Sequence, residues 1–205
     1  MITKVNLAKL VSEKNAKKYF DYLIKFTTKY EINTKTRFAY FLSQIIHESG
    51  AFTIGAENLS YNTFSRIQLI FKGSRSSLIS TALVRNPVLL GNTMYGGVWG
   101  KRNLGNTQEG DGFKFRGRGL IQVTGRGNYY RLSMQVFGDT RLIENPDLLL
   151  EPATNMECAA NDFVHSGCNI DADNNDFNSC TRHINGGLTN LADRVQILGQ
   201  VKKLI

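Results

Sequence analysis

Apolar residues recur at every third or fourth position along most of this chain, and this spacing predicts a mainly α-helical protein. Residues 34–48 are the clearest case, with a continuous apolar stripe along one face. Asn33 or Thr34 is a suitable N-cap for this helix, and Gly50 is a suitable stop. The expected helices cover residues 4–29 (as one or two helices), about 34–48, 63–71, 74–85, 128–137, 153–166, 176–184 and 190–204.

Residues 91–128 break this pattern, because glycine occurs 11 times within them. So many glycines disfavour a continuous helix and predict turns with short strands, including a small hairpin near 113–124. We therefore expect a single catalytic domain over residues 1–205, with residues 1–33 as part of it. Its fold would be two helical lobes, a small glycine-rich β or loop segment, and a substrate cleft of the kind that forms between lobes.

The composition is that of an ordinary folded protein, with 41% hydrophobic and 20% charged residues among 205. No apolar run reaches the roughly 18 to 20 residues of a membrane span, so we expect no stable membrane insertion. The net charge of +8 favours polyanionic partners such as nucleic acid, anionic membranes or bacterial walls. The basic residues are scattered and form no recognisable nucleic-acid module, which argues against a nucleic-acid binder.

We expect neither a metal nor another cofactor. Cys158, Cys168 and Cys180 are odd in number and fit no compact zinc spacing, so reduced, partly buried thiols are expected. The acidic stretch that begins at Asp171 resembles a calcium loop, but it lacks the central glycine and the glutamate at position twelve. His183 is too far in sequence from the other histidines to predict a ligand set.

Glu48 is the first candidate for catalysis. It lies in the last turn of the 34–48 helix, at the edge of the apolar stripe. Partial burial and the negative end of the helix dipole both disfavour an ionised carboxyl and raise its pKa. A carboxyl that keeps its proton can protonate a leaving glycosidic oxygen. The alternative is a solvated helix-end glutamate, or one paired with an arginine.

Glu57 is the second candidate and lies nine residues further on, in a predicted loop. Inverting glycosidases hold two carboxyls about 6.5 to 9.5 Å apart, so that a water fits between one of them and the sugar. A short loop at the end of a helix permits that separation. The alternative is a glutamate that caps the following helix.

Several motifs around these residues together resemble glycoside hydrolase family 19, and most closely its phage endolysin branch. They occur in the family's order over about residues 37–200, and the long run from Phe115 is highly specific. The matching stretches are His47–Gly50, Glu57–Tyr61, Gly110–Gly112, Phe115–Arg126, Asn128–Tyr130, Glu144–Leu149, Ile184–Gly187 and Ala192–Arg194.

The resemblance implies a lysozyme-like helical fold and an inverting single displacement. It implies Glu48 as the general acid, Glu57 as the general base and Thr124 as a hydroxyl that holds the attacking water. A threonine hydroxyl can donate and accept, as that role requires, although Thr124 alone would be taken for a strand residue. The resemblance also implies supporting or substrate-binding residues, which are Gln122, Asn128, Tyr129, Asn185, Tyr61, Trp99 and Arg194.

Arg194 and the aromatic residues have simpler alternative interpretations. The resemblance implies that Arg194 pairs with the catalytic carboxylates, where it would help to keep Glu57 ionised while burial keeps Glu48 protonated. Alone, Arg194 would be a surface residue of an amphipathic helix. Tyr129 and Trp99 alone would be core aromatics rather than sugar platforms.

The function that follows is an endolysin, which cleaves β-1,4 bonds between the aminosugars of bacterial peptidoglycan and lyses the host cell. A chitinase on the same scaffold and a catalytically inactive wall-binding module are the alternatives. The N-terminus lacks the pattern of a signal peptide, so we expect synthesis in the host cytoplasm. The expected monomer would then reach the periplasm or wall once a holin opens the membrane.

Overall fold

The computed structural model describes residues 2–53, 55–73 and 75–205, and helices dominate it, as the sequence predicts. The chain divides into two compact units that each combine separate segments. The terminal unit contains Met1–Gly55, Gly119–Ile121 and Leu148–Ile205, and the central unit contains Ala56–Arg118 and Gln122–Asp147. No helix in the described part of the chain is long and apolar enough to cross a bilayer.

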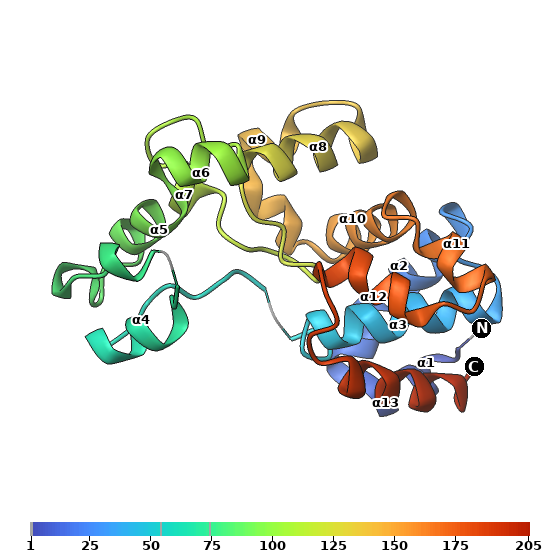
Figure 1. The fold of residues 1–205 in the computed structure, drawn as a ribbon. Helices are drawn as coiled ribbons and strands as arrows, with labels where there is room; N and C mark the ends of the chain where they lie inside the picture. The colour runs from blue at the N-terminus through green and yellow to red at the C-terminus, as the bar shows by residue number, and fades with distance from the viewer. Residues whose placement is uncertain (1, 54, 74) are drawn as a thin grey trace. The chain divides into compact units, whose positions relative to one another are not determined.

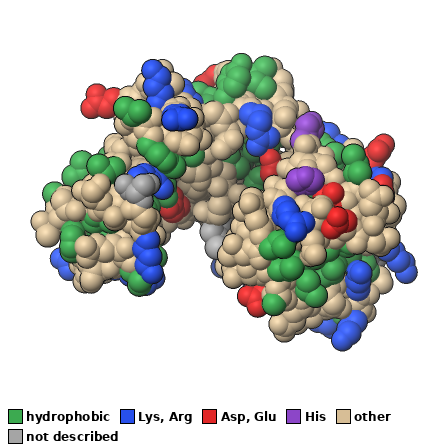
Figure 2. Space-filling view, viewed as in Figure 1, with side chains coloured by type: hydrophobic (Ala, Val, Ile, Leu, Met, Phe, Trp, Pro, Cys, Tyr) green, Lys and Arg blue, Asp and Glu red, His purple; other side chains and the backbone are tan. Residues whose placement is uncertain are grey.

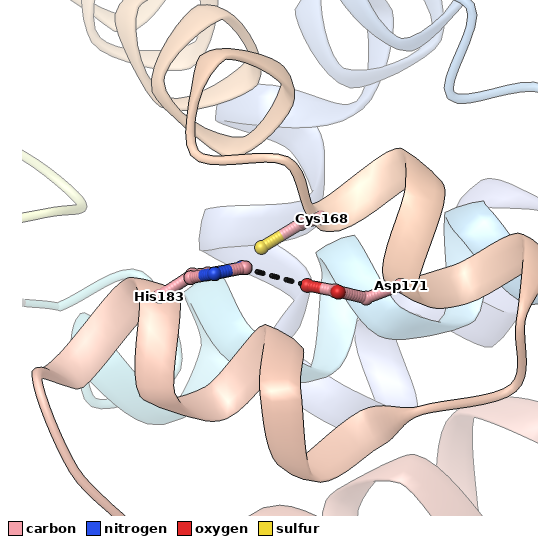
Figure 3. A group of neighbouring side chains, drawn as sticks. All are labelled: Cys168, Asp171 and His183. Carbon is pink, nitrogen blue, oxygen red and sulfur yellow. Dashed lines mark hydrogen bonds and ion pairs between the residues drawn. The ribbon is translucent and has the colours of Figure 1, made fainter.

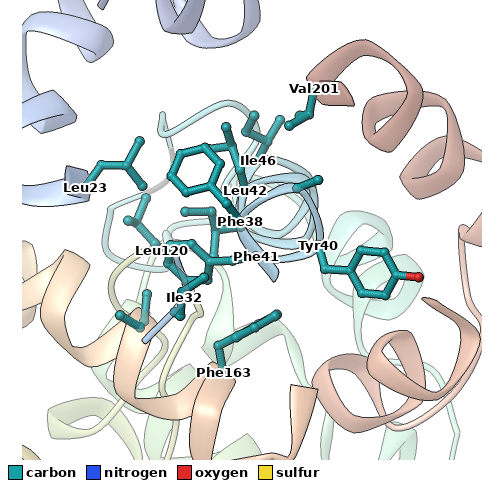
Figure 4. Close-up of a cluster of buried hydrophobic side chains, with 14 of the residues drawn as sticks. Leu23, Ile32, Phe38, Tyr40, Phe41, Leu42, Ile46, Leu120, Phe163 and Val201 are labelled. Atoms are coloured by element: carbon teal, nitrogen blue, oxygen red, sulfur yellow. The ribbon is translucent and has the colours of Figure 1, made fainter. Parts of the chain in front are cut away.

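The terminal unit is built around α3 (Lys35–Glu48), which packs against the four helices of the C-terminal segment (Figure 1). Phe38, Phe41 and Leu42 of α3 are fully buried and lie among side chains such as Leu23 and Phe163 (Figure 4). The other helices of this unit are α1 (Lys4–Val11), α2 (Glu13–Lys29), α10 (Pro152–His165), α11 (Cys168–Asp173), α12 (Phe177–Asn185) and α13 (Leu191–Lys202).

The central unit has shorter helices and a smaller core, formed by residues such as Leu59, Ile67 and Leu90. Glycines allow backbones to pack closely here. A Cβ at Gly112 would lie 2.5 Å from the Gly91 carbonyl oxygen. The helices are α4 (Phe64–Ile70), η1 (Ser76–Leu78), η2 (Thr81–Leu83), α5 (Pro87–Tyr95), α6 (Gly97–Leu104), α7 (Asp111–Lys114), α8 (Arg126–Phe137) and α9 (Arg141–Glu144). The 3-10 helix η3 (Pro146–Leu150) follows.

Most of the predicted helices are confirmed, and their caps explain where they begin. The predicted 4–29 segment forms two helices because Ser12, with φ of 104°, ends α1 and caps α2. Thr34 caps α3 through a hydrogen bond from the Arg37 amide, and Asp176 caps α12 in the same way. The helix predicted over 74–85 is wrong, since η1 and η2 occupy that stretch.

The glycine-rich segment differs most from the prediction. Much of it is helical. Several of its glycines stand at helix ends, as Gly96 before α6 and Gly105 after it, whereas others, such as Gly91 and Gly100, lie within helices. Pro87 begins α5, where a proline is tolerated at the first position. The predicted hairpin is reduced to two isolated bridges, in which Arg118 pairs with Ala56 and with Val123.

The three cysteines are free, as predicted, and they are fully rather than partly buried. Cys168 lies at the start of α11, a helix that the sequence analysis did not predict.

Candidate active site

Glu48 ends α3 in a network of side chains within the terminal unit. Arg194 of α13 is buried and donates from Nη2 to Oε1 of Glu48, whose side chain remains 24% exposed. The same guanidinium donates from Nη1 to Oε1 of Gln44 at 2.5 Å. Gln44 in turn donates to Oγ1 of Thr181 on α12 at 2.8 Å. Three helices therefore fix the position of one carboxyl group, and we call this set the Glu48 network.

Burial of the Arg194 guanidinium would be costly without a partner, and Glu48 supplies the compensating charge. Arg194 therefore pairs with Glu48, and such an arginine pair is also what the sequence analysis gave as the alternative to a catalytic Glu48. Because Oε1 of Glu48 accepts the hydrogen bond from Arg194, a proton that Glu48 donates must be carried on Oε2. Burial lowers the pKa of the adjacent His47, and the positive charge of Arg194 lowers it further.

Glu57 lies in the central unit and is held by different means. Its backbone amide donates to the Gly117 carbonyl at 2.7 Å, beside the bridge between Ala56 and Arg118. Its carboxyl accepts a hydrogen bond from the Tyr95 hydroxyl at 2.6 Å and one from the Gly117 amide at 3.3 Å. Burial raises the pKa of Tyr95, and the charge of Glu57 raises it further, so Tyr95 remains a donor. Two donors therefore orient this carboxyl group.

Three predicted site residues meet around Gly117. A Cβ at Gly117 would lie 2.8 Å from Oε1 of Gln122, 3.4 Å from Oγ1 of Thr124 and 3.5 Å from Cβ of Glu57. A side chain at this position would have to displace the end of the Gln122 side chain. The Thr124 hydroxyl donates to the Gln122 carbonyl at 3.0 Å, and its lone pairs can accept from a water molecule. The central unit thus brings the predicted base and the predicted water-holding hydroxyl together.

Asn128 and Tyr129 hold the loop around Gly117 through hydrogen bonds to its backbone. The Asn128 side chain donates to the Thr124 carbonyl at 2.8 Å. Tyr129 is fully buried, and its hydroxyl donates to the Arg116 carbonyl and accepts from Arg118. The sequence analysis allowed Tyr129 to line the sugar cleft, and the structure corrects this. Its ring packs against buried neighbours, so its role is to hold the loop.

The remaining predicted residues are more peripheral. Tyr61 is half-buried and packs edge-on against Phe71. Trp99 is partly exposed, and the Arg75 guanidinium lies 3.7 Å from its ring centroid. Asn185 is exposed at the last position of α12.

The sequence analysis missed Tyr95, Gln44 and Thr181. Gln44 carries a signal that could have found it, because it lies four residues before Glu48, on the same face of a helix that is otherwise apolar there. Tyr95 has no such signal, since it reaches Glu57 from a helix that was not predicted. Among the described residues, the one cluster that could hold a metal ion is Cys168, Asp171 and His183, outside the Glu48 network.

Comparison with known proteins identifies a relative in sequence. It is a "Glycosyl hydrolase family 19 domain-containing protein" of Haemophilus influenzae, 35% identical over 164 residues, which are 80% of this chain and 77% of the relative. No family model matches the chain.

Solved structures share the fold. Chitinase C of Streptomyces griseus HUT6037 superposes with a TM-score of 0.66 at 17% identity, over 99% of this chain and 76% of the chitinase. A bacterial family 19 chitinase superposes with a TM-score of 0.65 at 16% identity, over 99% of this chain and 94% of that protein. The predicted lysozyme-like helical fold is therefore confirmed.

Proposed function

Because the chain belongs to glycosyl hydrolase family 19, we propose that it acts as an endolysin, which hydrolyses β-1,4 bonds between the aminosugars of bacterial peptidoglycan with inversion. The observation that carries this proposal is the carboxyl of Glu57, held by Tyr95 and the Gly117 amide with the Thr124 hydroxyl beside it. A fixed carboxylate next to a fixed hydroxyl is what a general base needs to orient an attacking water.

In the proposed reaction, a water molecule lies between the Glu57 carboxylate and the Thr124 hydroxyl. Glu57 takes one proton as the water oxygen bonds to the anomeric carbon. The bond from that carbon to the glycosidic oxygen breaks, and Oε2 of Glu48 gives its proton to the leaving oxygen. Arg194 then stabilises the carboxylate that forms on Glu48. Glu57 gains one proton and Glu48 loses one, so proton exchange with solvent returns both carboxyl groups to their starting state.

Peptidoglycan is preferred as the substrate because of charge. The chain carries +8, and bacterial walls bear anionic polymers. On the face in Figure 2, Lys and Arg side chains are spread among neutral ones, as suits weak attraction to an extended polyanion. Chitin is the second candidate, because the structural relatives are named chitinases. Chitin consists of neutral aminosugars and would gain nothing from this charge.

Digestion of purified sacculi in heavy-oxygen water tests the reaction. Hydrolysis places one heavy oxygen at each new reducing end, and mass spectrometry of the fragments identifies which sugar carries it. Inversion gives the α-anomer first, and proton NMR at early times detects it. Fragments without heavy oxygen, or the β-anomer first, would contradict the mechanism.

The Glu48→Gln variant tests the acid. We expect the rate on sacculi to fall about 10²- to 10⁴-fold, as is usual for loss of general acid catalysis. Glu109→Gln is the matched control, because it removes the same charge from an exposed position and should leave the rate unchanged. Full activity in Glu48→Gln would refute the assignment. Unaltered protein that binds sacculi but releases no reducing ends would instead identify a binding module.

The substrate and the biological role have separate tests. Parallel rates on chitin oligomers and sacculi decide between the two substrates, and a preference for chitin would overturn our choice. Charge-driven attraction predicts that wall lysis slows as salt rises. Expression in bacterial cytoplasm should lyse cells only when a holin is co-expressed, as expected of a protein that needs release to the periplasm. Lysis without the holin would contradict that role.

A further inference from the structure

Three side chains with different donor atoms meet in the terminal unit, away from the Glu48 network. Cys168 begins α11, Asp171 lies one turn later on the same helix, and His183 faces them from α12 (Figure 3). A sulfur, a carboxylate oxygen and an imidazole nitrogen all lie within 4.8 Å of one another. Nδ1 of His183 and Oδ2 of Asp171 are 2.8 Å apart.

We propose that Cys168, Asp171 and His183 bind a zinc ion, with water as the fourth ligand. Thiolate, imidazole and carboxylate are the three ligand types that zinc takes in proteins, with bonds of about 2.0 to 2.3 Å. Tetrahedral bonds of that length separate the ligand atoms by about 3.3 to 3.8 Å. The distance between the His183 nitrogen and the Asp171 oxygen, 2.8 Å, is shorter than this range, and no pair of donor atoms is more than 4.8 Å apart. Side-chain rotations would therefore bring all three donors onto one ion.

The donor set also selects the metal. The sequence analysis rejected calcium for the stretch that begins at Asp171, and the structure gives a further reason. A buried sulfur is a poor ligand for calcium or magnesium, which prefer oxygen. A mixed sulfur, nitrogen and oxygen set suits zinc. Calcium binding therefore remains rejected, although Asp171 itself becomes a ligand of another metal.

Burial gives the site an inner and an outer side. Cys168 is fully buried, whereas the side chains of Asp171 and His183 are 13% and 48% exposed. The Cys168 thiol donates a long hydrogen bond of 3.6 Å to the Cys180 carbonyl and also interacts with the Cys180 side chain. The exposed side at His183 provides a route for the ion and room for the bound water.

Binding balances in charge. The ion displaces the thiol proton of Cys168, which leaves to solvent, and replaces the hydrogen bond between His183 and Asp171. His183 stays neutral, with its proton on Nε2 and the lone pair of Nδ1 on the metal. Two negative ligands and a divalent cation then sum to zero, which suits a partly buried position.

The proposed ion is structural, since it would tie α11 to α12. That matters for the Glu48 network because α12 also carries Thr181, two residues before His183. Thr181 accepts the hydrogen bond from Gln44, the partner of Arg194. Zinc would therefore stiffen one of the three helices that position Glu48, without touching the proposed reacting groups.

The test uses untagged, full-length protein that is reduced, stripped with a chelator and then titrated with zinc chloride. We expect one zinc per chain after desalting, by elemental analysis. The melting temperature should rise by about 5 to 10 °C when free zinc exceeds its Kd a hundredfold. Cobalt in place of zinc should give the intense visible bands of a tetrahedral site and a thiolate charge-transfer band. Less than a tenth of an equivalent retained, with no shift in melting, would overturn the proposal.

Variants separate this site from unspecific binding. Cys168→Ser and His183→Gln should weaken zinc binding at least tenfold, and Cys168→Ser should abolish the thiolate charge-transfer band of cobalt. Cys158→Ser and His165→Gln are the matched controls, a buried thiol and an exposed imidazole outside the cluster, and should bind as the unaltered chain does. His183 is half-exposed, so its variant should fold even if Cys168→Ser does not. Equal loss in the controls would refute the ligand assignment.

Discussion

The terminal and central units hold their carboxyl groups in opposite ways. Glu48 ends a long buried helix and is fixed by a charged partner, Arg194, which three helices enclose. Glu57 lies in a loop and is fixed by neutral donors, the Tyr95 hydroxyl and the Gly117 amide. The first arrangement depends on a buried ion pair and the second on close backbone approach. One unit should therefore be sensitive to loss of charge, and the other to loss of space or of a single hydroxyl.

Arg194→Ala should have the largest effect on stability. Removal of one partner of a buried pair leaves an uncompensated charge and costs about 3 to 5 kcal/mol, and the partial exposure of Glu48 favours the lower end. Urea unfolding measures this difference. Arg141→Ala is the control, because its pair with Asp139 is about half exposed on both sides and its loss should change stability very little. Equal losses of unfolding free energy in the two variants would show that the pair of Arg194 and Glu48 stabilises the fold no more than an exposed pair does.

Tyr95→Phe tests the hydrogen bond that the neutral Tyr95 hydroxyl donates to Glu57. A hydrogen bond to a charged group is worth about 1.5 to 3 kcal/mol, so kcat should fall roughly ten- to hundredfold. KM should stay within about twofold, because a carboxylate that turns the attacking water contributes little to ground-state binding. Tyr130→Phe removes an exposed hydroxyl and serves as the control. A rise in KM with unchanged kcat would contradict the positioning role.

Gly112→Ala tests the close packing of the central unit. The added methyl would lie 2.5 Å from the Gly91 carbonyl oxygen and 2.8 Å from Cα of Asn92, which is overpacking that costs about 1 to 3 kcal/mol. Gly199→Ala is the opposite case in the terminal unit. It lies within α13 with open space around its Cβ position, so alanine should stabilise the helix by about 0.5 to 1 kcal/mol. Unfolding curves that shift in the same direction for both variants would contradict this contrast.

The smallest expected effect is a difference in acid sensitivity. Burial lowers the pKa of His47 below its ordinary 6.5, so the folded terminal unit loses stability as pH falls below that value. Burial alone would raise the pKa of Asp111, but hydrogen bonds from Arg126 and Gln108 hold it below 3.8. The central unit should therefore lose its contribution from Asp111 only below about pH 4. Urea unfolding across pH measures both effects. His47→Gln should reduce the loss of stability just below pH 6.5, and Asp111→Asn should reduce the loss below about pH 4. If His47→Gln changed stability only below about pH 4 and Asp111→Asn only near pH 6.5, these two assignments would be refuted.

The two units also differ in how much the sequence predicts. In the terminal unit, long apolar stripes and side-chain caps such as Thr34 predict nearly every helix, because local periodicity and burial agree. In the central unit, the helices are short and contain or adjoin glycines, so the sequence pattern does not reveal them. The close packing of Gly112 against Gly91 can be seen only in the structure. Propensity alone therefore misassigned the helical residues 91–95, 97–104 and 111–114 as turns and strands.

The sequence named the charged and hydroxyl residues of the candidate site and supports such as Arg194 and Asn128, but it did not reveal Tyr95, Gln44 or Thr181. Glu48, Glu57 and Thr124 stand in recognisable motifs, and their contacts within each unit agree with the expected roles. Their catalytic roles stay predictions. Tyr95 could not be found because its contact with Glu57 joins residues 38 positions apart. The zinc ligands were missed for the same reason, since His183 meets Cys168 only when α12 folds back on α11.

The terminal unit combines both ends of the chain, and this affects how the protein is made. The buried face of α3 is covered largely by α10 to α13, which follow it much later in the chain, and Arg194 comes 146 positions after Glu48. During synthesis, the apolar side chains of α1, α2 and α3 therefore stay exposed until the later helices have been made. Chaperones bind nascent chains in this state. Glu48 cannot pair with Arg194 before α13 has been translated, so a product that stops short of α13 should lack this ion pair.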